Sequence, residues 1–453
     1  MERESVTERA TAPAPSGPRG YPIVGVLPLL FKNPLGFLVK TAHEYGDIVR
    51  MGVGKRQFYL ASHPDSLQHM LQDNSTNFWK GAGMDMTRPL MGDGLAVSEG
   101  DLWRRQRRLM QPTFSATRVL ESLPHVRAPV EELIAEWESR DSKRVELDVS
   151  VAMNHLTQDL LLRSLFRIDL GPNSPILGKA CASAQSYINY RAFAPFALPL
   201  KVPVPRNLQF KRALAALDRV LFGLIDERAK NPVGDDLLTT LLQAETPEDP
   251  KKKRQQIRDE MVTLLFAGHE TTAGALVWTL YLLTQHPEAV ARIRSEAERA
   301  FVSADTIDVS VLSYTVMVVQ ESMRLYPPGW IMVRTSREAD VLCGYAIPAV
   351  ATVLISPYVT HRRRDFWPQP EEFRPERFSK TESAERPQFA YCPYGGGPRK
   401  CIGERLASLI VQVVIARLCL DYTPKFLGTR PPAIRPLTTL QPKGAVMIAM
   451  EKR

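Results

Sequence analysis

The sequence lacks the cysteine pairs that build a disulfide scaffold or a structural zinc site. Its five cysteines are odd in number and scattered, and none stands in a C-x-x-C pair. This usage favours a reducing cytoplasm. The chain also lacks an early apolar block, because its first 20 residues are charged and rich in proline and alanine. We therefore expect a cytoplasmic protein with neither a secretion signal nor a stable membrane anchor.

Other common signatures are missing as well. The net charge is +9, yet no long basic tract or basic–aromatic repeat is present, so nucleic acid is not an expected partner. An acidic protein partner, an anionic cofactor or a membrane surface would suit the basic excess better. Gly52-x-Gly54 lacks the third glycine of a dinucleotide-binding loop, and no G-x-x-x-x-G-K-[S/T] sequence occurs. His269-Glu270 does not begin the H-E-x-x-H motif of zinc proteases, because position 273 is alanine where that motif requires a second histidine.

The hydrophobic patterning that is present predicts a mainly α protein with a minor β component. We expect residues 1–20 to form a flexible arm and residues 21–453 to form a single domain. The clearest helix covers residues 254–285 and is apolar nearly all round over Met261–Leu283, as in a helix that crosses the middle of a large core. The other expected elements are helices at 287–300, 310–326 and 403–420, and short strands at 47–51, 57–61, around 334, at 346–347 and at 350–355.

A glycine-rich loop with one cysteine precedes the last helix. It reads Tyr394-Gly-Gly-Gly-Pro-Arg399-Lys-Cys401-Ile-Gly403. Three glycines and a proline allow a tight loop whose backbone approaches a large, flat partner. Cys401 lies just before a helix N-terminus, where the helix dipole favours the thiolate. A glycine-rich surface turn with a core cysteine is the alternative, but the spacing is very specific.

A second motif, Ala267-Gly268-His269-Glu270-Thr271-Thr272, lies in the middle of the long helix. Glycine inside a helix costs about 1 kcal/mol relative to alanine, so its presence needs a reason. A locally opened helix with a threonine hydroxyl would make a polar notch in an apolar wall. The alternative explanation is that the packing around the helix simply tolerates a glycine at this position.

The cysteine loop resembles the haem-binding signature of the cytochrome P-450 family, matching at Gly397, Arg399, Cys401 and Gly403. Tyr394 departs from the usual phenylalanine, and its hydroxyl needs a partner. The resemblance covers roughly residues 18–450 and implies the cytochrome P-450 fold. It further implies haem b (iron protoporphyrin IX) between the long helix and the last helix, with Cys401 as the iron ligand.

The same resemblance implies roles for other residues. Thr271 would hydrogen-bond dioxygen, and Glu270 would relay protons toward it. Trp103 and Arg107, which form a W-x-x-x-R element, would contact the haem propionates, and so would Arg334 and Arg399. Glu321, Arg324 and Arg377, from E-x-x-R and P-E-R-F sequences, would form a structural triad. Ala267, Trp330 and Ile331 would line the substrate pocket.

The implied reaction is monooxygenation of a hydrophobic substrate, in which one oxygen atom of O₂ is inserted as a hydroxyl group or an epoxide. No flavin or nicotinamide module fits within the remaining length, so a ferredoxin or flavodoxin with its reductase is expected to supply electrons to a monomeric protein. A basic face with Arg104, Arg105, Arg108, Lys400 and Arg405 would attract such partners. Fatty acids, terpenoids, steroids and macrolides stay open as substrates, with a slight lean toward fatty acids from the C-I-G-E-R-L-A sequence. Two rival functions are a peroxide-dependent or rearranging enzyme, and a non-catalytic haem-binding sensor or carrier.

Overall fold

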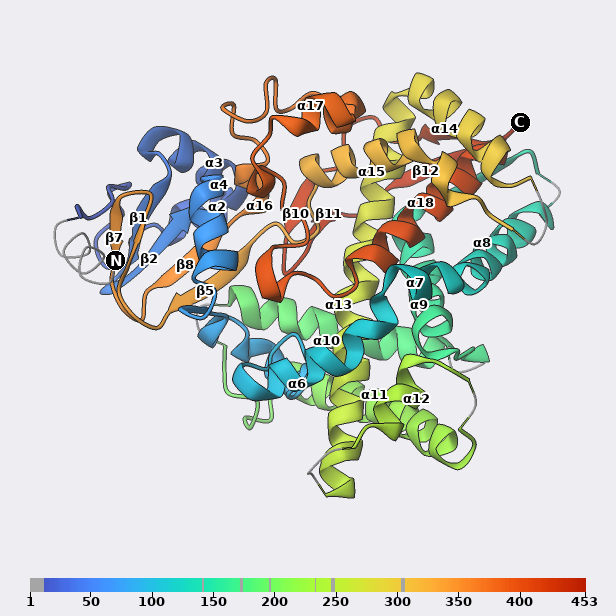
Figure 1. Cartoon of the computed structure of the whole chain (residues 1–453), viewed down its shortest axis with the longest axis horizontal. Helices are drawn as coiled ribbons and strands as arrows, with labels where there is room; N and C mark the ends of the chain where they lie inside the picture. Colours follow the sequence, from blue (N-terminus) through green and yellow to red (C-terminus); the bar gives the residue numbers. More distant parts are fainter. Residues whose placement is uncertain are drawn as a thin grey trace. The chain divides into compact units, whose positions relative to one another are not determined.

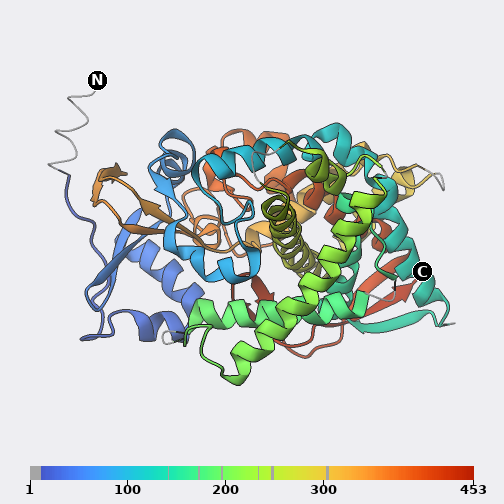
Figure 2. The ribbon, with the colours of Figure 1, turned by 90° about the horizontal axis from the view of Figure 1, so that it is seen from below.

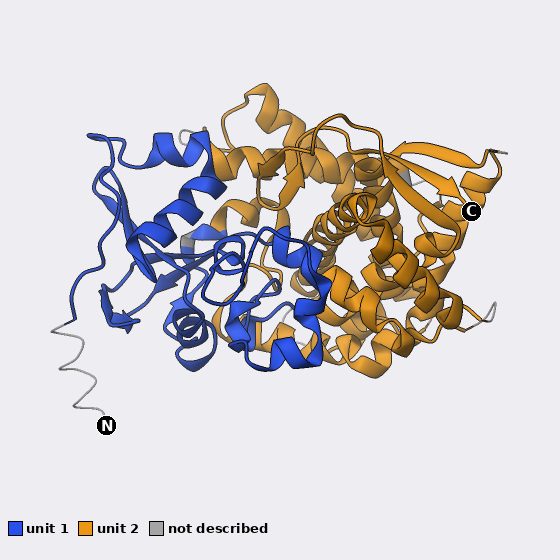
Figure 3. Cartoon of the chain, turned by 90° about the horizontal axis from the view of Figure 1, so that it is seen from above, with its two compact units in different colours: residues 1–84, 320–401 blue, residues 85–319, 402–453 orange. Residues whose placement is uncertain are grey.

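A computed structural model describes residues 12–140, 142–171, 174–194, 197–232, 234–245, 249–302 and 306–453. The chain divides into two compact units (Figure 3). Unit 1 holds residues 1–84 and 320–401, and unit 2 holds residues 85–319 and 402–453. The predicted arm at 1–20 falls largely on residues 1–11, outside the described residues. From Pro13 onward the arm is attached to unit 1, because the carbonyls of Pro13 and Ser16 accept hydrogen bonds from the backbone amides of Ala346 and Arg50.

Unit 1 is built around a five-stranded sheet of order β1-β2-β8-β5-β3, in which β2 and β8 are parallel and the other neighbours antiparallel. The strands of unit 1 are β1 (Ile48–Val53), β2 (Arg56–Ala61), β3 (Phe78–Trp79), β5 (Met332–Ser336), β6 (Asp340–Leu342), β7 (Tyr345–Ile347) and β8 (Thr352–Ile355). Of these, β6 and β7 pair with each other outside the five-stranded sheet. Its short helices are α2 (Leu27–Lys32), α3 (Pro34–Tyr45), α4 (Pro64–Gln68), α16 (Pro357–Thr360) and α17 (Lys380–Ala384). Buried side chains of β1, β2 and β8 form its core with Leu67, Met70 and Phe389.

Unit 2 carries most of the helices (Figure 1). They are α5 (Arg88–Met91), α6 (Gly100–Met110), α7 (Ala116–Glu121), α8 (Leu123–Glu138), α9 (Val149–Phe166), α10 (Ser174–Phe193), α11 (Pro205–Lys230), α12 (Leu237–Gln243), α13 (Pro250–Gln285), α14 (Pro287–Ala300) and α18 (Glu404–Asp421). Helix α15 (Ser313–Leu325) runs from unit 2 into unit 1. Two small sheets complete unit 2: β4 (Arg144–Asp148), β12 (Met447–Lys452) and β9 (Tyr422–Phe426) in one, and β10 (Ile434–Pro436) with β11 (Leu440–Pro442) in the other.

Helix α13 is the central element of unit 2, and Figure 2 looks nearly along its axis. It begins where the Asp249 carboxylate accepts hydrogen bonds from the amides of Lys251 and Lys252, at 2.9 and 3.1 Å. It ends before Pro287, since the residue preceding a proline avoids the helical conformation. Helices α9, α11 and α18 and strand β9 pack against it. The predicted helices and strands are confirmed within a few residues, and so is the mainly α class. In the described part of the chain, no helix is both long and apolar enough to cross a bilayer.

Candidate active site

The cysteine loop of unit 1 is fixed by its glycines. Gly395 and Gly397 have φ angles of 71° and 62°, in the left-handed region that favours glycine. A Cβ atom on Gly397 would lie 1.7 Å from the carbonyl oxygen of Leu71, and one on Gly396 would lie 2.2 Å from the Phe389 ring. The loop closes through a 3.0 Å hydrogen bond from the amide of Cys401 to the carbonyl of Tyr394. The backbone therefore packs where no larger residue fits.

The side chain of Cys401 is exposed, unlike those of the buried Cys181, Cys392 and Cys419. Burial raises the pKa of each of these three thiols to about 12, so they stay protonated at neutral pH. Helix α18 begins at Glu404, three residues after Cys401 in the chain. Cys343 is partly exposed, so Cys401 is the most exposed of the five cysteines and the one best placed to bind a ligand.

Helix α13 is continuous through the second motif, but it is more exposed there than on either side. Ala267 is exposed, and Gly268, His269 and Thr271 are partly exposed, although the helix is otherwise buried from Met261 to Leu283. The Thr271 hydroxyl donates a 2.6 Å hydrogen bond to the Ala267 carbonyl, one turn earlier. Packing also explains Gly268, because a Cβ there would lie 3.0 Å from a methyl carbon of Leu161 on α9. The contact with Leu161 supports the packing explanation of this glycine, and the helix is not locally opened there.

Glu270 is buried, whereas Ala267 is exposed and Thr271 is partly exposed. Its buried carboxylate accepts a hydrogen bond from the Gln441 amide on β11, and the neighbouring Thr439 side chain also favours its charged form. Burial raises the pKa of Glu270 to about 7 despite these two polar neighbours. The group can therefore both hold and release a proton near neutral pH.

A cavity of about 740 Å³ in unit 2 reaches this carboxylate. It is lined by residues of α9, α10, α13 and the β10–β11 hairpin, among them His155, Asn189, His269, Glu270 and Gln441. His269 contacts the Asn154 carbonyl through Nε2 at 3.0 Å, and burial lowers its pKa to about 4. His269 is therefore neutral at pH 7, with its Nε2 proton donated to that carbonyl.

Glu321, Arg324 and Arg377 come together in the interior of unit 1. The Arg324 guanidinium pairs in bidentate fashion with the Glu321 carboxylate at 2.7 and 2.8 Å, and Arg377 Nε lies 3.3 Å from the same carboxylate. All three side chains are at most 1% exposed. The two arginines also donate to backbone carbonyls of the irregular segment 361–372, at His361, Pro368, Gln369, Pro370 and Glu372.

His361 connects this cluster to the cysteine loop, and no sequence motif indicated it. Its ring is fully buried, and Nε2 accepts a 3.0 Å hydrogen bond from the amide of Cys392. Its Nδ1 lies 3.3 Å from the Arg324 carbonyl. Burial and the neighbouring arginines hold the pKa of His361 well below its usual value, so the ring is neutral. His361 thereby connects the residues just before the cysteine loop to the cluster of Glu321, Arg324 and Arg377.

The residues expected at the haem propionates belong to both units. Trp103 and Arg107 are partly exposed on one face of α6 in unit 2. Arg334 on β5 and Arg399 in the cysteine loop belong to unit 1, where Arg334 is 6% exposed and donates to the Val333 carbonyl. Of the expected pocket residues, Trp330 is buried in unit 1, and its carbonyl accepts a hydrogen bond from Ser356. Ile331 and Tyr394 are partly exposed in the same unit.

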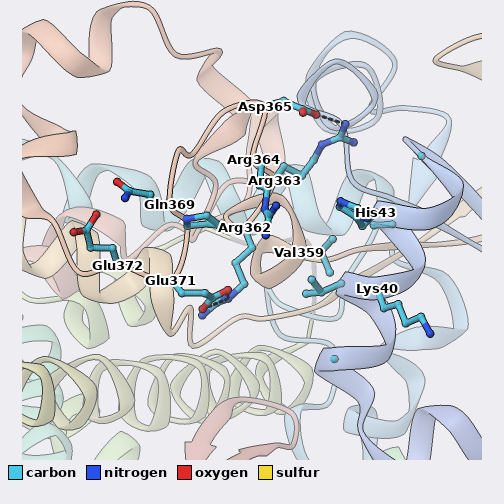
Figure 4. A pocket seen from close by; sticks show the side chains of 15 residues that line it. Lys40, His43, Val359, Arg362, Arg363, Arg364, Asp365, Gln369, Glu371 and Glu372 are labelled. Atoms are coloured by element: carbon cyan, nitrogen blue, oxygen red, sulfur yellow. Dashed lines mark hydrogen bonds and ion pairs between the residues drawn. The ribbon is translucent and has the colours of Figure 1, made fainter.

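A further cavity of about 920 Å³ in unit 1 contains none of these residues (Figure 4). It lies between α3 and residues 359–372. Its arginines are largely paired, Arg362 with Glu371 and Arg363 with Asp365. Its lining has ion pairs rather than an oriented set of catalytic groups.

Comparison with known proteins identifies the class of this protein. The Cytochrome P450 family model matches residues 15–449, and the chain belongs to that family. Its members are haem-binding monooxygenases that require redox partners. The crystal structure of the cytochrome P450DA heme domain superposes with a TM-score of 0.85 over 98% of both chains, at 22% identity. This match agrees with the fold expected from the sequence.

Among its named relatives, Cyclooctatin synthase of Streptomyces melanosporofaciens is 35% identical, over 85% of this chain and 84% of the relative. Cyclooctat-9-en-7-ol 5-monooxygenase of the same organism is 33% identical, over 89% and 88% of the two chains. Pentalenene oxygenase of Streptomyces avermitilis is 28% identical, over 89% and 90%. The chain is thus similar to bacterial monooxygenases along most of its length.

Proposed function

We propose that this protein inserts one oxygen atom of O₂ into a terpenoid-like hydrocarbon, with Cys401 as the proximal ligand of the haem iron. The observation that carries this proposal is the exposed Cys401 thiol at the end of a loop whose glycines admit no side chain. The residues present fit the cofactor, because the thiolate of the exposed Cys401 is a ligand suited to iron. Arg107, Arg334 and Arg399 would pair with its propionates, assisted by Trp103.

When bound, the thiolate-ligated haem supplies the oxidising chemistry by favouring cleavage of the O–O bond. The balanced reaction is R–H + O₂ + 2e⁻ + 2H⁺ → R–OH + H₂O. Glu270 can hold a proton near neutral pH, and it lines a cavity whose polar side chains, among them His155 and Gln185, could help to reload it. Thr271 follows Glu270 in the chain, and its hydroxyl provides a hydrogen-bonding group at the exposed part of α13. The presence of both Glu270 and Thr271 favours a monooxygenase over a peroxide-dependent or rearranging enzyme.

The names of the relatives narrow the substrate class. They specify cyclooctat-9-en-7-ol, pentalenene and, for an Arabidopsis thaliana protein 28% identical to this chain, carotene. All three are terpenoids, which supports a terpenoid ahead of the fatty acid that the sequence slightly favoured. Ala267, Trp330 and Ile331 are proposed to contact it with apolar surface. Titration of the purified protein with cyclic terpene alcohols should shift the haem spin state, whereas fatty acids should not.

The decisive experiment is the difference spectrum of the reduced protein with carbon monoxide, for wild type and Cys401→Ser. Thiolate-ligated ferrous haem gives a strongly red-shifted Soret band, which wild type should show and the variant should lose. A band at the position typical of histidine ligation in wild type would overturn the assignment. Turnover with a surrogate ferredoxin system then separates the candidates. Activity with peroxide alone would favour the peroxide-dependent enzyme, and the absence of both activities would favour a sensor.

We further propose that the electron donor is an acidic ferredoxin or flavodoxin that docks on basic residues. Arg104, Arg105 and Arg108 are exposed on α6, although Arg104 is partly neutralised by Asp101. Reversing the charge of Arg104 and Arg105 should slow reduction by the donor and flatten its dependence on salt concentration. Stopped-flow reduction kinetics that are unchanged at low salt would refute this docking site.

A further inference from the structure

Helix α9 contributes one polar face to the cavity of about 740 Å³ in unit 2. Ser150, Asn154 and Gln158 stand at every fourth position of α9, so they share a face of that helix, and all three line the cavity. The Asn154 side chain donates a hydrogen bond to the Ser150 carbonyl. By contrast, the Gln158 amide nitrogen and the Ser150 hydroxyl are buried without a hydrogen-bond partner among the described residues.

The unpartnered amide of Gln158 needs an explanation, because this residue is only 6% exposed. A buried donor without an acceptor costs free energy of folding, and the great majority of buried polar groups in folded proteins are paired with protein or with water. Water can occupy the position next to Gln158 when the cavity is empty, and an oxygen atom of a ligand can replace that water. The cavity therefore offers a ready donor to a ligand that carries an acceptor.

The cavity also carries positive charge. Arg435 on β10 and Arg206 on α11 line it, and in the described part of the chain neither guanidinium forms an ion pair with a carboxylate. Arg206 instead lies over the Tyr190 ring, 4.2 Å from its centroid. Glu270 is the only acidic residue among the described lining residues, and its carboxylate already accepts a hydrogen bond from Gln441. An anion is therefore the complementary ligand.

Apolar side chains complete the wall of the cavity. They belong to Ala182, Phe193, Phe266 and Leu437. Sites for small organic ligands commonly combine an apolar wall with a few polar groups that fix the orientation of the ligand. We propose that this cavity is a binding site for an amphipathic carboxylate, whose head group pairs with Arg435 and accepts a hydrogen bond from Gln158. Its hydrocarbon part would contact the apolar wall.

Such a ligand would act on Glu270. A second negative charge in the cavity disfavours the charged form of the Glu270 carboxyl group, so the group keeps its proton. The ligand would thereby regulate the delivery of protons by Glu270. This consequence rests on the proposed function, whereas binding of the carboxylate does not.

The test is isothermal titration calorimetry of the full-length, haem-loaded protein with octanoate, and with octanamide as its neutral counterpart. Wild type should bind octanoate with a Kd of about 1 mM or tighter, and octanamide at least about fivefold more weakly. Arg435→Gln should weaken octanoate binding at least about tenfold, and Gln158→Leu about fivefold. Arg430→Gln is the matched control, because Arg430 is exposed in unit 2 and does not line the cavity.

The haem spectrum separates this cavity from the substrate pocket, since saturating octanoate should leave the spin state unchanged. The carbon monoxide spectrum checks the folding of each variant, and the Tm of Gln158→Leu should not fall, because leucine removes an unpartnered donor. The proposal is overturned if wild type does not bind octanoate, if octanamide binds as tightly, or if Arg435→Gln and Gln158→Leu bind as well as Arg430→Gln. A spin-state shift with octanoate would place the ligand in the substrate pocket instead and would also overturn it. These outcomes do not depend on the reaction of the enzyme.

Discussion

Replacing Glu270 with glutamine should stabilise the protein, by an amount that depends on pH. Burial raises the pKa of Glu270 from an ordinary value of 4.5 to about 7. Because the folded pKa lies above the unfolded one, wild type loses stability as the pH rises from 4.5 to 7 and no more above that range. A difference of about 2.5 pKa units corresponds to about 3 kcal/mol. Glutamine does not ionise, so Glu270→Gln avoids this loss.

The expected shift is measurable by thermal unfolding. For a chain of 453 residues, the unfolding entropy is roughly 950 cal/mol/K, so about 3 kcal/mol corresponds to a Tm increase of about 3 °C. The Tm of Glu270→Gln should match wild type near pH 4.5 and exceed it by that amount at about pH 8. A Tm difference that is constant over this range would refute the reasoning.

Glu260, on the same helix, is the matched control. It is fully buried, accepts hydrogen bonds from the Leu95 amide and the Gln256 side chain, and also has a pKa raised to about 7 by burial. Glu260→Gln should therefore show a similar pH-dependent stabilisation. Only Glu270→Gln should slow turnover, by roughly 10²-fold or more, if Glu270 delivers protons. Equal slowing of both variants would argue against proton delivery by Glu270.

Three further variants test the site. Arg324→Ala leaves the Glu321 carboxylate buried without its bidentate partner, so urea denaturation should show a loss of about 3–5 kcal/mol, and a loss under about 1 kcal/mol would contradict the burial argument. Gly397→Ala should nearly abolish haem-loaded protein, whereas Gly444→Ala, which has a positive φ but open space around it, should cost only about 1 kcal/mol. Thr271→Ala should leave Tm within about 1 °C of wild type, since only a hydrogen bond within its own helix is removed, while product formed per electron consumed should fall.

The chemistry-bearing motifs could be predicted because their signals are local. The glycines around Cys401 and the continuous apolar pattern of α13 are visible within a few turns of chain. The ends of α13 and α14 follow from Pro250 and Pro287. Short strands with proline, such as β10 and β11, have no such pattern and were missed.

The contacts that position those motifs could not be predicted. Gln441 stands 171 residues from Glu270, and no periodicity links them. His361 directly precedes a run of three arginines that suggests a solvated segment, yet its ring is buried and accepts a hydrogen bond from the amide of Cys392. In both cases a distant backbone brings the partner into place, which a single sequence does not encode in any local pattern.

The irregular segment 361–378 is held from the interior, although it has little regular structure and a third of its residues are exposed. Buried guanidinium groups of Arg324 and Arg377 hold its carbonyls at several successive positions. Surface loops usually tolerate insertion and exchange between relatives, but each of these carbonyls would lose a fixed donor if the chain length changed. Chimeras of related enzymes should therefore keep 361–401 as one block with the α15 sequence that carries Glu321 and Arg324, and place their crossovers elsewhere.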